Sequence, residues 1–178
     1  MTFLNIIPYF TSMKKLDFNP LKSGEDFRSN YKLHDLAEAS GKNLLTQWGL
    51  NYKEFGEDRR YQSVWEKGED KPDIILSYKD IHAFLDWKGK HHSHWLVNQR
   101  AINAYENWSK RFNIPIIIAF FVFDINKALL ERRFAFLNLH NYIASQKKQW
   151  DKNTTVEFRA DIPEFTKGNL LKCLLEYK

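Results

Sequence analysis

The ten residues 114–123 contain no polar side chain and consist mostly of isoleucine, valine and phenylalanine. These residue types favour a β-strand, and the lack of polar alternation indicates a strand that is buried on both faces. The segment is about half as long as a membrane-spanning helix. We therefore expect it to lie inside the covered sheet of an α/β protein rather than to cross a membrane.

The size and composition of the chain narrow the class of protein. Its 178 residues suit one domain, and the single cysteine, Cys173, excludes a disulfide framework and a multi-cysteine zinc site. The first ten residues are apolar but lack the basic region and cleavage site of a secretion signal. We therefore expect a soluble, intracellular, cytoplasmic protein without a membrane partner. The formal net charge of +5 is compatible with a polyanionic partner.

Apolar periodicity and turn signals predict the element order α-β-β-β-α-β-β-α. Apolar residues at three- and four-residue steps predict a helix over 33–48, with Asn30 as its N-cap and Gly49 at its end. We expect one domain over 1–178, with an arm at 1–30, a core at 33–140 and a C-terminal extension at 141–178. The predicted strands are 61–66, 72–76, 82–88, 114–123, 134–139 and 156–159, and the other helices are 95–112, 142–150 and 169–177. This order predicts a central mixed β-sheet flanked by helices.

Two aspartates lie on neighbouring predicted strands. A two-residue turn at Lys79 and Asp80 would pair residues whose numbers add up to 159, which places Asp73 opposite Asp86. Their Cβ atoms would be about 4.5–5.5 Å apart on one face of the sheet. Because facing carboxylates repel each other and lose solvation, a divalent cation between them is favoured. Mg²⁺ suits oxygen ligands and binds substrate phosphates.

A lysine completes this group of side chains. Lys88 follows Asp86 by two residues and therefore projects from the same face of the strand. Its ammonium could orient or help to deprotonate an attacking water, or stabilise charge on a phosphate. A metal, a lysine and carboxylates are the parts that phosphodiester hydrolysis requires.

The pairing of Pro72-Asp73 with Asp86-Trp87-Lys88 resembles the motif of the PD-(D/E)xK nuclease superfamily, which has the restriction-endonuclease-like fold. The predicted order also resembles that fold: a helix with an acid, a meander with the motif, a helix and a buried strand. The resemblance covers roughly residues 33–140 and implies a DNA endonuclease that uses Mg²⁺, with Mn²⁺ able to substitute. Trp87 departs from the pattern because it is bulky for the middle position. Restriction, homing, junction-resolving, repair and phage enzymes all stay open.

Residue roles follow from this resemblance. Asp73 would be the central metal ligand, Asp86 the second ligand, and Glu38 on the first helix would complete the metal site. Lys88 would lie next to the nucleophilic water. Because the chain is too small for much separate recognition machinery, a structure-selective enzyme or a homodimer is favoured.

Residues after the motif supply further candidates. Gln99, early in the next helix, resembles a glutamine that several branches of the superfamily place near the site, and Tyr105 is a weaker candidate on the same helix. Basic and histidine side chains in this region are candidates for nucleic-acid binding, namely Lys90, His91, His92 and Arg100.

Three other interpretations remain open. The two aspartates and Lys88 could be ordinary solvent-facing strand-end residues. The chain could bind nucleic acid on the same fold without catalysis. His91, His92 and His94 could hold zinc, although neighbouring loop histidines seldom supply a complete tetrahedral set.

Overall fold

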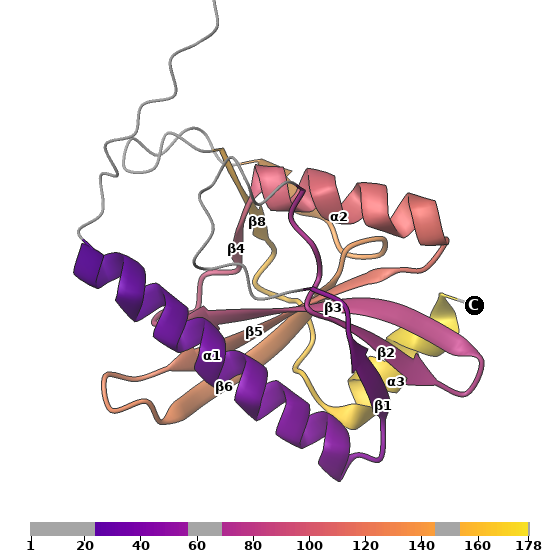
Figure 1. The fold of residues 1–178 in the computed structure, drawn as a ribbon, viewed down its shortest axis with the longest axis horizontal. Coiled ribbons are helices and arrows are strands. Elements are labelled where there is room, and N and C mark those ends of the chain that lie inside the picture. Colours follow the sequence, from indigo (N-terminus) through magenta and orange to yellow (C-terminus); the bar gives the residue numbers. More distant parts are fainter. Residues whose placement is uncertain (1–23, 57–68, 145–153, 178) are drawn as a thin grey trace, which may run out of the picture.

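The computed structural model describes residues 24–56, 69–144 and 154–177. A five-stranded mixed sheet forms its centre (Figure 1), in the order β1-β2-β3-β5-β6. Its strands are β1 (Asn51–Glu54), β2 (Ile74–Tyr78), β3 (Ile81–Lys90), β5 (Ile116–Phe123) and β6 (Leu129–Phe136). β3 and β5 are parallel, and the other neighbours are antiparallel.

Helices and a second, smaller sheet surround this centre. The helices are α1 (Gly24–Gln47), α2 (Gln99–Phe112) and α3 (Lys167–Glu176). The smaller sheet has the order β4-β8-β7, from β4 (Leu96–Asn98), β8 (Thr155–Phe158) and β7 (Tyr142–Ala144). The predicted α/β class, with a central mixed sheet flanked by helices, is confirmed.

The central sheet divides two apolar cores, because alternate residues of β3 and β5 face opposite sides. Leu85 and Trp87 pack with α1 and α3, whereas Phe84 packs with α2 and the smaller sheet. β5 is buried along its whole length, as its composition predicts. Residues of 156–174 contribute to both cores, so this C-terminal segment is integral to the packing.

Two glycines bring α1 close to β3. A Cβ atom at Gly41 would overlap the ring of Trp87, and a Cβ atom at Gly89 would overlap the backbone of Leu33. Any larger residue at either position would push the helix away from the strand. This close approach fixes where the polar residues of α1 lie relative to the end of β2.

The predicted pairing of β2 with β3 is confirmed. The partners run from Ile74 with Leu85 to Tyr78 with Ile81, and each pair of numbers adds up to 159. Lys79 in the turn has φ 55°, a left-handed conformation that a two-residue hairpin turn requires.

Several predicted boundaries are wrong. α1 begins at Gly24, so Asn30 is not its cap and residues 24–30 are not an arm. Residues 142–144 form strand β7 rather than a helix, because they pair with β8. Residues 96–98 form β4 before α2 begins at Gln99, and the predicted strand 134–139 is β6, which begins at Leu129.

The predicted strand 61–66 and most of the arm 1–30 lie outside the described residues. No helix in the described ranges is long and apolar enough to span a bilayer.

Candidate active site

The candidate site lies where β2 begins and β3 continues beside β5. The β2–β3 ladder ends at Ile74, and β3 pairs with β5 up to Lys90. Beyond the ladder, Asp73 Oδ2 accepts a hydrogen bond of 2.7 Å from the Trp87 backbone N–H, where a strand partner would otherwise accept it. The Asp73 carboxylate therefore lies at an opening of the sheet that side chains from both faces can reach.

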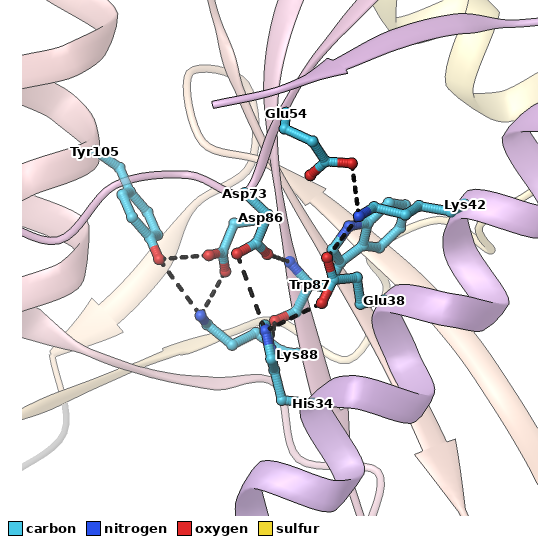
Figure 2. Close-up of polar contacts among 9 residues, drawn as sticks. All are labelled: His34, Glu38, Lys42, Glu54, Asp73, Asp86, Trp87, Lys88 and Tyr105. Atoms are coloured by element: carbon cyan, nitrogen blue, oxygen red, sulfur yellow. Dashed lines mark hydrogen bonds and ion pairs between the residues drawn. The ribbon is translucent and has the colours of Figure 1, made fainter. Parts of the chain in front are cut away.

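On the α2 side, a closed polar network surrounds Asp86 (Figure 2). Tyr105 donates a hydrogen bond of 2.6 Å to Asp86 Oδ1. Lys88 Nζ lies 2.5 Å from Asp86 Oδ2 and 3.4 Å from the Tyr105 hydroxyl. Lys88 and Asp86 therefore form a short, charge-assisted ion pair. Asp86 is only 2% exposed, and its charge therefore depends on these two partners.

Burial and charge change the pKa values of this network. Burial raises the pKa of Asp73 well above its ordinary value, and repulsion by Asp86 adds to that effect. Burial lowers the pKa of Lys88, but attraction by Asp86 and Asp73 outweighs it, so the pKa is raised. Burial and Asp86 also raise the pKa of Tyr105 well above its ordinary value, so its hydroxyl remains a hydrogen-bond donor. The two acids thus repel each other, as predicted for a pair that favours a cation.

On the α1 side, a more open group of charged residues approaches Asp73 (Figure 2). Lys42 Nζ lies 2.6 Å from Glu38 Oε1 and 2.7 Å from Glu54 Oε1. Burial lowers the pKa of Lys42, but the bonds to Glu38 and Glu54 outweigh it and raise the pKa. Lys42 therefore joins an acid of α1 to an acid of the edge strand β1.

His34 bridges this group to Asp73. Its Nδ1 lies 3.1 Å from the Trp87 carbonyl, which can only accept a hydrogen bond, so Nδ1 carries the hydrogen. The Nε2 atom lies 3.8 Å from Glu38 Oε2 and 4.0 Å from Asp73 Oδ1. The position of the hydrogen on Nδ1 follows from the hydrogen-bond network.

The structure thus places Asp73, Asp86, Lys88 and Glu38 around one point of the fold. The other candidates have different partners: Gln99 bonds Asn103, Arg100 pairs with Asp70, and Lys90 bonds the Leu96 carbonyl. His91, His92 and His94 are exposed, and they form no group in the described part of the chain that could hold a metal.

Three residues near the site escaped the sequence-based prediction: His34, Lys42 and Glu54. His34 and Lys42 lie four residues before and after Glu38, so helical spacing places them on its face of the helix and could have revealed them. Glu54 gave no such signal, because its strand was not predicted.

The carboxylates of the site have the chemistry of a metal site but not the placement of one. As they are placed, no three His, Cys, Asp or Glu side chains within the described ranges are close enough to hold one. The donor chemistry nevertheless fits Mg²⁺, since the central groups are carboxylates and charged Asp73 and Asp86 repel each other. To hold an ion together, the side chains of Asp73, Asp86 and Glu38 would have to move toward one another.

Comparison with known proteins finds similarity in fold but not in sequence. No protein-family model matches the chain, and no curated protein matches its sequence. The fold is similar to that of Hjc, a Holliday junction resolvase from Archaeoglobus fulgidus, with a TM-score of 0.43 and 12% sequence identity. The match covers 68% of this chain and 85% of that chain. A likeness at this distance does not assign a function.

Proposed function

We propose that this protein is a metal-dependent endonuclease that hydrolyses phosphodiester bonds in DNA. The observation that carries the proposal is the pair of mutually repelling carboxylates, Asp73 and Asp86, just beyond the end of the β2–β3 ladder, with Lys88 paired to Asp86. The ordinary surface interpretation does not suit this pair, because Asp86 is buried. Buried, mutually repelling carboxylates are costly to maintain and are typical of functional sites.

Each side chain has a chemical task in this proposal. Asp73 and Asp86, with Glu38 assisting, would hold Mg²⁺. When bound, that ion would supply Lewis acidity toward a phosphate and toward water. Lys88 donates N–H bonds and positive charge, which stabilise the negative charge that develops on the phosphate. Tyr105 holds Asp86 through its hydroxyl and so fixes the orientation of that carboxylate.

A cleavage assay tests this function. Purified protein is incubated with supercoiled plasmid, linear duplex and a four-way junction, each with Mg²⁺, Mn²⁺ or EDTA. We expect cleavage with either metal, none with EDTA, and a loss of at least about a hundredfold in Lys88→Met and Asp86→Asn. Lys110→Met, at an exposed position of α2, is the matched charge control and should retain activity.

The same assay separates the main rival. A catalytically silent DNA-binding protein would bind these substrates with a steep dependence on salt concentration and cut none of them with any divalent ion. Cleavage that survives both Lys88→Met and Asp86→Asn would refute the assigned residues.

A further inference from the structure

The ammonium group of Lys42 is a cation that lies between two carboxylates from different elements. Its Nζ lies 2.6 Å from Glu38 Oε1 on α1 and 2.7 Å from Glu54 Oε1 on β1. Its side chain is only 24% exposed, and its stem is anchored on a helix that packs closely on β3. This ammonium cannot diffuse away, whereas a bound metal ion can.

The site contains more carboxylates than ammonium groups, even when Lys42 is included. Four carboxylates line the site, namely Asp73, Asp86, Glu38 and Glu54. Two ammonium groups face them, one at each end: Lys88 on Asp86, and Lys42 between the two glutamates. Asp70, whose charge also reaches Lys88, is paired with Arg100.

The negative charge that the two ammonium groups leave uncompensated lies near Asp73, between Lys88 and Lys42. Four acids and two ammonium groups leave a formal charge of −2 before His34 is counted. One divalent ion balances that charge. A second ion at Glu38 and Glu54 would have to displace Lys42 or face its positive charge at short range, which is unfavourable at a partly buried position.

We propose that Lys42 is a built-in cation that occupies the place of a second metal ion, so that the site binds a single divalent ion. This inference rests on the proposed metal-dependent function and specifies its metal content. It makes Lys42 a positioning residue, since it acts through Glu38 and Glu54.

The test is the number of Mn²⁺ ions bound per chain, measured from free Mn²⁺ by electron paramagnetic resonance and by titration calorimetry. We expect one ion in the wild type and in Lys42→Arg, which keeps the charge. Lys42→Met should gain a second, weaker site, and the double variant Lys42→Met with Glu54→Gln should return to one ion. Lys172→Met is the matched control, because Lys172 also pairs with a glutamate four residues away on a helix but is 74% exposed. That control should bind one ion.

Each outcome bears on a distinct claim. Two ions in an active wild-type enzyme would overturn this inference and leave the proposed nuclease function standing. No bound ion would overturn both this inference and the metal dependence of the function. A single ion in folded Lys42→Met, as judged by circular dichroism, would also contradict the role of Lys42. If Lys42→Met does not fold, Lys42→Gln takes its place, because the amide can still donate to Glu38 and Glu54 without carrying a charge. It should likewise bind a second ion, and a single ion in folded Lys42→Gln would contradict the role of Lys42.

Discussion

The two sides of the site use the same kinds of group in different surroundings. Toward α2, Lys88 pairs with Asp86, which is 2% exposed, and Tyr105 closes the network. Toward α1, Lys42 pairs with Glu38 and with Glu54, whose side chain is 60% exposed. The two lysines are similarly exposed, Lys88 at 26% and Lys42 at 24%, so the sides differ in their acids. Asp86 is shielded from water, whereas Glu38 and Glu54 can both turn to it.

This difference in burial predicts different consequences for the two lysines. Removing one partner of a buried ion pair leaves an uncompensated charge and costs about 3–5 kcal/mol. Solvent-exposed pairs contribute roughly 0–1 kcal/mol. The α2 side should therefore contribute more to stability, while the α1 side can exchange partners when a cation binds.

The largest effect should come from comparing Lys88→Met with Lys42→Met in metal-free buffer. We expect Lys88→Met to lower the free energy of unfolding by about 3–5 kcal/mol, because Asp86 would stay buried without its ammonium. Lys42→Met should lower it by no more than about 1 kcal/mol. Urea denaturation followed by tryptophan fluorescence measures both values. Equal losses would show that the two sides do not differ as described.

A smaller difference in the free energy of unfolding is expected between variants of two tyrosines, each of which donates a hydrogen bond to a carboxylate. Tyr105→Phe removes a buried bond to Asp86, and we expect a loss of about 1.5–3 kcal/mol. Tyr142→Phe removes a 3.0 Å bond to Glu106 at a more open position, and we expect about 0.5–1 kcal/mol. Chemical denaturation again measures the difference, and a larger loss in Tyr142→Phe would contradict it.

The smallest predicted change in the free energy of unfolding is a gain in stability rather than a loss. Asp73 lies between the two sides, and its charged form is disfavoured by burial and by Asp86. We expect Asp73→Asn to stabilise the metal-free protein by about 1 kcal/mol at neutral pH, since the amide carries no charge and can still accept from Trp87 N–H. Thermal unfolding in EDTA measures this gain.

Metal addition provides the complementary result for Asp73. Mg²⁺ should raise the melting temperature of the wild type, because an ion that binds only the folded state stabilises it. Asp73→Asn should show little or no such rise. A variant that is less stable than the wild type in EDTA, or that gains equally from Mg²⁺, would contradict the role given to Asp73.

The parts of the site that could be predicted from sequence depend on local rules. A two-residue turn fixes strand pairing, so the β2–β3 register follows from residue numbers alone. One step beyond this ladder, the same numbering brings Asp73 close enough to Asp86 for the two to repel each other. The all-apolar composition of residues 116–123 likewise identifies β5 as a buried strand. Glu38 was suggested by the resemblance to the nuclease motif, and the structure places its Oε2 3.8 Å from His34 Nε2.

The features that could not be predicted from the sequence depend on tertiary contacts. β1 has four residues with largely exposed side chains, so no apolar pattern in the sequence indicates a strand there. It forms because it pairs with β2. Without β1, the position of Glu54 beside Lys42 cannot be inferred. Arg100 looks like a phosphate contact in the sequence, yet Asp70 from a distant loop binds it through two hydrogen bonds.

The most direct test of the proposed metal site is a crystal structure of the protein soaked in Mn²⁺, with the ion located by its anomalous scattering. We expect one peak between Asp73 and Asp86, with Glu38 turned toward it. Carboxylates that point apart with no ion between them, or an ion bound instead at His91, His92 and His94, would contradict the proposed site.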